Sequence, residues 1–396
     1  MELEKSDQPE QAKRNGGNKM KKKIMCLAVA AVTASMSVTP VFADDLNLVF
    51  ECDKTEGFVI GYSNGYWGNT WRAQMVEDFE NRAKEYKDAG VISDYMISNT
   101  NNDPTEQLNQ LNAMIDSGVD AIIIDAVSPT TIKPAVEKAQ RDGILVVVSN
   151  DPAYYEGTVC VCGDNYTWQK IQVEWLVAQL DGKGNIVEIQ GVAGNSANTL
   201  RVQANEDVLA DYPDINILAS APGSWSETEA QTLMTTYLSS YDNIDAVLEQ
   251  DVMGEGVIKA YENAGKELPI MTGDYTKAFL TKWSELPNLN SIGVSYAPGN
   301  SVPGLDVAVR LLQGKTLKSD VLVPNPMDES KVNAIMVEPP YVVTRDGDDS
   351  QAWAQSLPET TKLISLEEAL EIMADQADTA ALDGYPDQEV IDGYFE

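Results

Sequence analysis

A strand, a glycine-rich turn and a helix are predicted in succession by the segment Gly57-Phe-Val-Ile-Gly-Tyr-Ser-Asn-Gly-Tyr-Trp-Gly-Asn-Thr-Trp-Arg72. Its run Phe58–Tyr62 is β-branched and aromatic, which is typical of a buried strand. The glycines and asparagines that follow favour turns and helix caps. From Thr70 onward apolar residues recur at helical spacing. Ligands bind at such turns in open α/β sheets, at the carboxyl ends of the strands.

The turn also carries the side chains of a candidate binding site, namely Tyr66, Trp67, Trp71 and Arg72. Aromatic faces stack on sugar rings, and a guanidinium donates paired hydrogen bonds to a diol or a carboxylate. The alternative is that the aromatic residues belong to the core and that Arg72 is a solvated helix charge.

Strand and helix patterns alternate from Gly57 onward. Several strand-like runs are continuously apolar, which is typical of parallel strands buried on both faces. We therefore predict an α/β fold with doubly wound parallel sheets. The predicted strands are 95–98, 121–125, 145–150, 158–162, 185–190, 215–220, 246–251, 270–274 and 291–296.

Acidic and amide residues end several of these strands, and a weak internal repeat relates two of the strand–helix–strand units. Two parallel lobes would bring such strand ends to one cleft. Each acid could instead cap the helix that follows it. The candidates at strand ends are Asp125, Asn150, Asp151, Gln250, Asp251 and Asp274.

The composition excludes several classes of function. The chain has 396 residues, a formal net charge of −34 and no histidine. Such a charge disfavours nucleic acid as a partner, and the missing histidine excludes Ser-His-Asp and Cys-His catalysis. No dinucleotide fingerprint or phosphate-binding loop is present, so we expect no cofactor and no metal. Cys160 and Cys162 are expected to be buried thiols, although a disulfide between them is open.

The N-terminal residues predict export. A polar extension precedes Met20-Lys-Lys-Lys23, an apolar run over 24–38 and Val41-Phe-Ala43, which is the order of a secretory signal peptide. We take Met20 as the start and Ala43 as the last residue removed, with the mature protein in the periplasm or cell envelope. Cys26 lies too early for a lipoprotein site. A membrane anchor is the disfavoured alternative because the run is short.

The pattern weakens after Pro339, and an amphipathic helix is predicted over Ser365–Ala377. Residues 378–396 are acidic and poor in core formers. We expect them to form a peripheral tail without a site.

From Gly57 to Thr344 the order of these motifs resembles the periplasmic sugar-binding proteins of the ribose- and galactofuranose-binding kind. The motifs include Ser63 to Arg72, Gly118-Val-Asp-Ala-Ile-Ile123 and Glu188-Ile-Gln-Gly-Val-Ala-Gly194. The resemblance implies two lobes joined by three crossovers, with the ligand cleft between them. The implied ranges are 57–163 and 297–324 for the N-terminal lobe, 164–296 and 325–345 for the C-terminal lobe, and 346–396 for an acidic extension.

The resemblance also assigns roles to residues. The Trp71-Arg72 pair is similar to that of galactofuranose binders, Arg201 to the second-lobe arginine and Trp225 to its stacking aromatic residue. Tyr296 occupies the position of the hinge glutamine. Ribose-type members have Asp-Arg where this chain has Asn150-Asp151, so the ligand need not be ribose. Aromatic and acidic side chains together suit a neutral sugar or polyol.

The function implied is a non-enzymatic, monomeric solute-binding protein that delivers a sugar or polyol to an ABC transporter permease. The alternative is a receptor that presents a sugar or autoinducer to a sensor kinase or chemoreceptor. A glycoside-hydrolysing enzyme is disfavoured because no hydrolase motif accompanies the acids. On this hypothesis, Arg72→Ala or Trp225→Ala removes ligand affinity and leaves the melting temperature of the empty protein nearly unchanged.

Overall fold

The structure, a computed structural model, describes residues 50, 52 and 54–396. The predicted extension and signal peptide (1–43), the cleavage site after Ala43 and Cys26 lie outside the described residues. Among the described residues no helix has the length and apolar character needed to cross a membrane.

The first sheet has seven strands and is mostly parallel. Its order is β11 (Val323–Asn325), β12 (Asp328–Val337), β5 (Val159–Gly163), β4 (Leu145–Asn150), β3 (Ala121–Ile124), β1 (Phe58–Asn64) and β2 (Ile92–Asn99). Among the described strands of this sheet, only the β11–β12 pair is antiparallel.

The second sheet also has seven strands. Its order is β14 (Lys362–Ser365), β13 (Tyr341–Thr344), β10 (Ser291–Val294), β9 (Ile270–Thr272), β8 (Ala246–Glu249), β6 (Gly184–Gln190) and β7 (Ile215–Pro222). β13 runs antiparallel to β10. The five strands β7-β6-β8-β9-β10 repeat the order of β2-β1-β3-β4-β5, so the internal repeat seen in the sequence is a repeat of topology.

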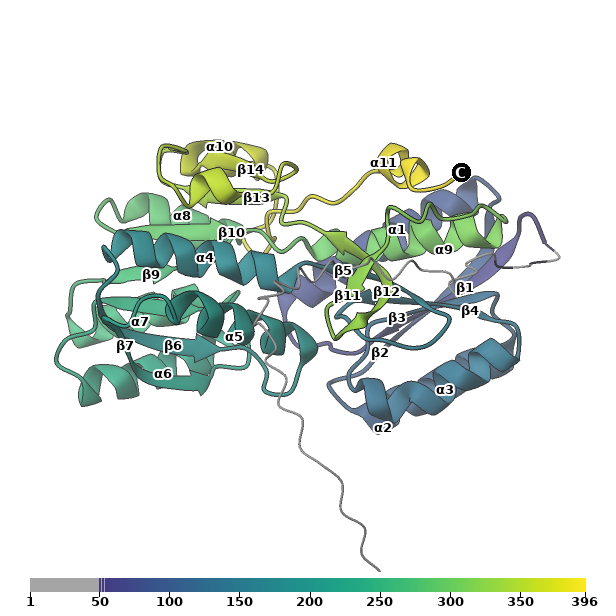
Figure 1. Ribbon diagram of the computed structural model, residues 1–396, viewed down its shortest axis with the longest axis horizontal. Helices are drawn as coiled ribbons and strands as arrows, with labels where there is room; N and C mark the ends of the chain where they lie inside the picture. Colours follow the sequence, from purple (N-terminus) through teal and green to yellow (C-terminus); the bar gives the residue numbers. More distant parts are fainter. Residues whose placement is uncertain (1–49, 51, 53) are drawn as a thin grey trace, which may run out of the picture. The chain divides into compact units, whose positions relative to one another are not determined.

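Helices cover both faces of the first sheet, as the continuously apolar strands predict. In β3, Ala121 and Ile123 join one core cluster, and Ile122 and Ile124 join the other. The helices α1 (Thr70–Asp88) and α9 (Ser301–Leu312) lie on one face (Figure 1). The opposite face is covered by α2 (Pro104–Ser117) and α3 (Pro129–Arg141). The predicted α/β doubly wound class is confirmed.

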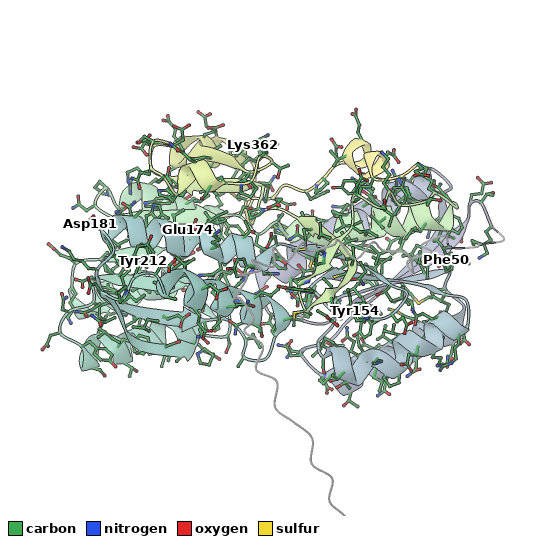
Figure 2. All side chains as sticks on the ribbon, viewed as in Figure 1. Phe50, Tyr154, Glu174, Asp181, Tyr212 and Lys362 are labelled. Carbon is green, nitrogen blue, oxygen red and sulfur yellow. The ribbon has the colours of Figure 1, made fainter. Side chains whose placement is uncertain are left out.

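The helices of the second sheet continue the alternation. They are α4 (Asn165–Gln179), α5 (Ser196–Leu209), α6 (Glu227–Ser240), α7 (Gly254–Ala264), α8 (Lys277–Glu285) and α10 (Leu366–Ile372). Charged side chains next to these elements, such as Asp181 after α4 and Lys362 on β14, are exposed and project outward (Figure 2).

The chain passes between the sheets three times, after β5, after β10 and after β12. The second passage contains the short 3-10 helix η1 (Pro298–Asn300). A fourth passage follows α10: the segment after Ala381 leads to α11 (Gln388–Gly393), which packs on α9 of the first lobe.

Two expectations for the C-terminal part are wrong. We expected 325–345 in the C-terminal lobe, but β12 pairs with β5 of the first sheet, so the chain changes sheet only after Val337. Residues 378–396 are not a peripheral tail, because Leu382, Ile391 and Phe395 are buried. Both the sheet that β12 joins and the burial of the last residues depend on contacts between residues far apart in the chain. The local sequence pattern does not reveal such contacts.

The cysteines match the prediction of buried thiols. Cys160 and Cys162 on β5 are free and fully buried. Cys162 Sγ lies 3.6 Å from Met336 Sδ on the neighbouring strand β12. Both cysteines belong to the apolar core of the first lobe.

Candidate functional site

A pocket lies where strands of both sheets end. The space between its side chains, mouth included, measures about 390 Å³. Its lining comes from the turn before α1, the first turn of α1, the ends of β4, β8 and β10, the first half of α5 and the loop before α6. The lining residues are Tyr66, Asn69, Trp71, Arg72, Asn150, Asp151, Ala197, Arg201, Trp225, Asp251, Val252 and Tyr296.

The glycine-rich turn sets the position of the α1 side chains. A Cβ atom on Gly65 would come 2.7 Å from the Asp125 carbonyl oxygen, so only glycine lets this turn approach the end of β3. Asn69 caps α1, because its side-chain oxygen accepts from the Arg72 backbone N–H at 2.9 Å. The helix therefore begins at the point that directs Trp71 and Arg72 into the pocket.

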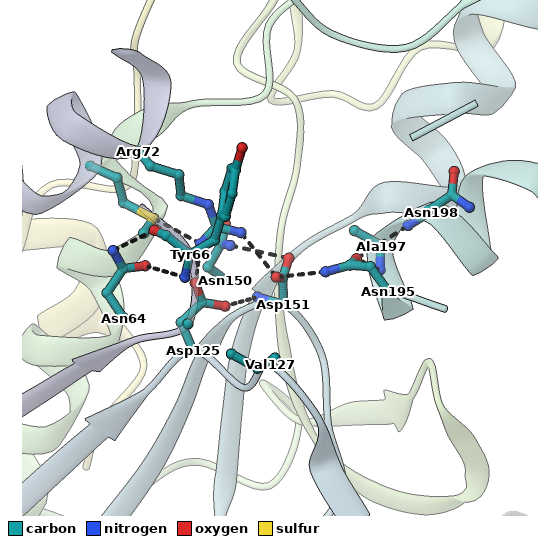
Figure 3. A network of polar contacts seen from close by, with 12 residues as sticks. Asn64, Tyr66, Arg72, Asp125, Val127, Asn150, Asp151, Asn195, Ala197 and Asn198 are labelled. Atoms are coloured by element: carbon teal, nitrogen blue, oxygen red, sulfur yellow. Dashed lines mark hydrogen bonds and ion pairs between the residues drawn. The ribbon is translucent and has the colours of Figure 1, made fainter. Parts of the chain in front are cut away.

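Arg72 holds two carboxylates together. Its guanidinium pairs with Asp125 and, at 3.0 Å, with Asp151 Oδ2 (Figure 3). Asn195, which precedes α5 of the second lobe, donates to the same Asp151 oxygen at 3.1 Å. The Asn195 contact joins the two lobes across the pocket. We call this arrangement, in which the lobes contact each other across the pocket, the closed arrangement.

The electrostatics of this cluster follow from its burial. Burial raises the pKa of Asp125 to about 7; the Arg72 charge opposes this rise and the nearby Asp151 adds to it. Burial lowers the pKa of Arg72, but the attraction of Asp125 and Asp151 outweighs it, so the net shift is upward. The guanidinium is therefore charged at all physiological pH values.

Arg201 on α5 forms the second cationic centre. Its guanidinium carbon lies 4.0 Å from the ring centroid of Trp168 and 4.9 Å from that of Tyr296. It also pairs with Asp251, and its Nε donates to Asn165 Oδ1 at 2.9 Å. Cation–π contacts and hydrogen bonds together fix the plane of this side chain.

Aromatic rings form the walls of the pocket. Trp71 and Tyr296 stack with centroids 5.7 Å apart, and Trp71 Nε1 donates to the Tyr296 carbonyl at 2.8 Å. The loop residue Trp225 is held at a positive φ of 53°, and its Nε1 is buried without a partner among the described residues. A buried, unused donor beside a pocket is available to a ligand.

Strained backbone gathers at the same place. Asn150, Trp225, Asp251 and Val252 all have positive φ values and all line the pocket. Residues other than glycine adopt this conformation at a cost that the surrounding structure must offset. Such outliers are typical of ligand sites.

The structure brings most of the predicted site residues to this pocket, and four lie elsewhere. Asp125 is buried behind Arg72, and Gln250 and Asp274 are buried behind the lining. Trp67 is 46% exposed and lies outside the lining. None of the strand-end acids caps the next helix, because Ser128, Met253 and Thr276 occupy the N-cap positions of α3, α7 and α8.

Sequence reasoning missed several residues of the site. Asn69, Ala197 and Val252 line it, while Asn165 and Trp168 hold Arg201 from α4. The capping pattern of Asn69 was a usable signal. The contacts that α4 makes with Arg201 could not be predicted from the sequence, because α4 and α5 come together only in the folded chain.

The family follows from the match of residues 60–316 to the model of the periplasmic binding protein domain. The chain belongs to the periplasmic binding protein family. Its members are extracytoplasmic solute receptors without enzymatic activity. The resemblance to this family drawn from the sequence is confirmed.

Three individual proteins illustrate the relationship. A xylitol-binding protein of Mycolicibacterium smegmatis is 33% identical over 231 residues, which are 56% of this chain and 65% of that protein. A ribose import binding protein of Bacillus subtilis is 24% identical, over 78% of this chain and 98% of that protein. The crystal structure of an ABC transporter solute-binding protein from Thermobispora bispora is 26% identical, with a TM-score of 0.65 over 83% of this chain and 98% of that one.

Proposed function

We propose that this periplasmic binding protein captures one sugar or polyol in the pocket between its lobes and delivers it to the permease of an ABC importer. The observation that carries the proposal is the combination of aromatic walls with two arginines and several carboxylates in one pocket. Rings of Trp71, Trp225 and Tyr296 offer faces to C–H groups of a sugar. Carboxylates and guanidiniums offer acceptors and donors to its hydroxyls.

The charges favour a neutral ligand. Arg72 is matched by Asp125 and Asp151, and Arg201 is matched by Asp251. An anionic ligand would have to displace a buried carboxylate from its arginine, which costs several kcal/mol. A polyhydroxylated neutral molecule needs no such exchange.

The names of the relatives agree with this class. The relatives that bear the names xylitol-binding and ribose import binding protein indicate a polyol or a pentose as the first ligands to test.

We assign the contacts to the residues that line the pocket. Tyr66, Trp71, Trp225 and Tyr296 would stack on the ligand, while Arg72, Arg201, Asn150, Asp151 and Asp251 would bond its hydroxyls. Asp125 would act through Arg72, and Gln250 and Asp274 would support the loops from behind. Trp67, which is exposed and outside the lining, would not touch the ligand.

The remaining steps belong to the same proposal. The precursor would be exported and cleaved after Ala43, and the mature monomer would close on its ligand by hinge motion. Residues 57–163 would form the main part of the first lobe, and residues 164–296 would form that of the second. Later segments of the chain would complete each lobe. The closed form would then dock on the permease.

The test is titration calorimetry of the mature protein, from Asp44 onward, with xylitol and ribose, after a thermal-shift screen of monosaccharides, polyols and uronates. We expect a neutral sugar or polyol to bind and to raise the melting temperature with concentration. Trp225→Ala should weaken this binding, and Trp67→Ala, which removes an exposed tryptophan outside the pocket, should not. Binding confined to uronates, or equal loss in both variants, would contradict the proposal.

A further inference from the structure

The C-terminal segment, residues 381–396, connects the two lobes a fourth time. It leaves the second lobe at Thr276, the N-cap residue of α8, and passes η1. It ends in α11, which packs on α9 of the first lobe (Figure 1). We propose that this segment is a strap that favours the closed arrangement of the lobes and positions the pocket helix α1.

Ala381 is the residue where the strap meets both lobes. It forms an antiparallel bridge with Thr276 of the second lobe. The side chain of Gln74 on α1 bonds the same residue twice: its Oε1 accepts from the Ala381 N–H at 2.9 Å and its Nε2 donates to the Ala381 carbonyl at 3.3 Å. A single residue therefore ties α1 to the second lobe at the start of α8.

The next residues of the strap contact the loop after β9 and the passage that contains η1, which we call the hinge. The Leu382 N–H donates to the Tyr275 carbonyl at 2.9 Å, and the Leu382 carbonyl accepts from the Ser295 hydroxyl, just after β10. Asp383 Oδ1 accepts from the Gly299 N–H of η1 at 3.0 Å. A Cβ on Gly299 would come 2.0 Å from the Tyr385 ring, so the hinge turn and the strap are packed without space for a side chain between them.

The far end of the strap is fixed to the first lobe. Asp392 on α11 pairs with Arg310 of α9 and with Lys315, each at 3.0 Å. Leu317 and Phe395 form an antiparallel bridge. Phe395 is buried, so the end of the chain is anchored in the core as well as by charge.

These contacts place the strap where it affects the pocket. On α1, Gln74 follows Trp71 by three residues and Arg72 by two, and both of these residues line the site. Opening the lobes would separate α1 from Thr276 and would break the shared contacts of Ala381. Interactions made only in the closed arrangement shift the population toward it and slow release of the ligand.

The test uses Gln74→Leu in the full mature protein, because leucine keeps the volume and removes both bonds to Ala381. The matched control is Gln140→Leu. It removes one similar bond, from Gln140 Nε2 to the Glu156 carbonyl at 2.7 Å, inside the first lobe only. Gly299→Ala is the second variant. Its added methyl group would displace the Tyr385 ring and so loosen the contact between the strap and η1.

The ligand-free proteins give the first readout, which does not depend on the proposed function. We expect Gln74→Leu and Gly299→Ala to increase the radius of gyration in small-angle scattering and to speed amide exchange over 378–396. The control should leave both quantities unchanged. The same radius of gyration and the same amide exchange rates in the wild-type protein and all variants would contradict the proposal that this segment acts as a strap.

The second readout rests on the proposed function and uses xylitol and ribose as probes. We expect the dissociation rate constant of the bound probe to rise about fivefold or more in Gln74→Leu, the lower end of typical coupling between sites. If the radius of gyration changes and the dissociation rate constant of the probe does not, the proposal that the strap positions α1 would be wrong. Failure of the wild-type protein to bind any sugar or polyol would overturn the proposed function, and the ligand-free readout would still decide the strap.

Discussion

Arg72 is more than a ligand donor, because two buried carboxylates depend on it. Asp125 is 1% exposed and Asp151 is 5% exposed, and both pair with this guanidinium. The sequence-based expectation that Arg72→Ala spares the stability of the empty protein therefore no longer follows from the structure. The corresponding expectation for Trp225→Ala, that the stability of the empty protein is nearly unchanged, still follows because Trp225 is only partly buried.

We predict that Arg72→Ala lowers the free energy of unfolding of the ligand-free protein by about 3–5 kcal/mol, because it leaves buried carboxylates without a counter-charge. Urea denaturation measures this loss. The control is Arg141→Ala, which removes an arginine from the exposed end of α3. A change below about 1 kcal/mol for Arg72→Ala, within the range of exposed ion pairs, would show that the cluster is solvated.

Asp274 gives the stability a specific pH dependence. Burial raises its pKa to about 7, and hydrogen bonds from the Tyr275 backbone and the Thr276 hydroxyl oppose the rise. Between about pH 4 and pH 7 the folded chain keeps a proton that the unfolded chain has lost. The contribution to stability therefore falls as pH rises through this window and is constant above it.

We predict that the ligand-free protein melts at a higher temperature at pH 5 than at pH 8, and that Asp274→Asn reduces this difference. A tenfold difference in proton affinity between the folded and unfolded chains corresponds to about 1.4 kcal/mol of stability. Asp375→Asn, a change at an exposed acid, is the control. A slope that is the same in both variants would mean that Asp274 titrates normally in the folded state.

At the scale of elements, glycines at strand ends decide where the aromatic walls stand. Gly163 ends β5 and Gly191 follows β6. A Cβ on Gly163 would lie 2.3 Å from the Tyr296 ring, and one on Gly191 would lie 2.3 Å from the Trp225 ring. Neither ring could keep its place beside a side chain at these positions.

We predict that Gly191→Ala weakens ligand binding about tenfold or more, because it displaces the Trp225 indole, worth about 1–3 kcal/mol as a stacking surface. Calorimetry with the ligand found in the screen measures the change. Gly393→Ala adds a methyl group where no atom lies within 4 Å and serves as the control. Unchanged affinity in Gly191→Ala would remove Trp225 from the site.

At the scale of the whole molecule, the net charge of −34 works against compactness. Like charges on one folded surface repel each other, and added salt screens the repulsion. The internal pairs around Arg72 and Arg201 are buried and are screened much less.

We predict that the melting temperature at pH 7.5 rises as NaCl is increased from about 10 to about 150 mM, over which the screening length shortens from about 30 to about 8 Å. Near the sequence pI of about 4.2 the same addition should have little effect. A fall in melting temperature with salt at pH 7.5 would show that attractive surface pairs outweigh the repulsion.

Local sequence alone determined the alternation of strands and helices from Gly57 to Tyr296, because apolar periodicity reports how each element is buried. It also determined the turn before α1 and the polar strand ends, since parallel strands bring their carboxyl ends to one edge. Only the tertiary structure decided which carboxylates meet Arg72, which aromatic rings enclose Arg201 and why Trp67 stays exposed. It also decided that β12 joins the first sheet and that the last residues form a strap. These outcomes depend on contacts between residues that are far apart in the chain, such as Gln74 with Ala381 and Leu317 with Phe395. A local pattern shows that a side chain is buried, and the folded chain alone determines its partner.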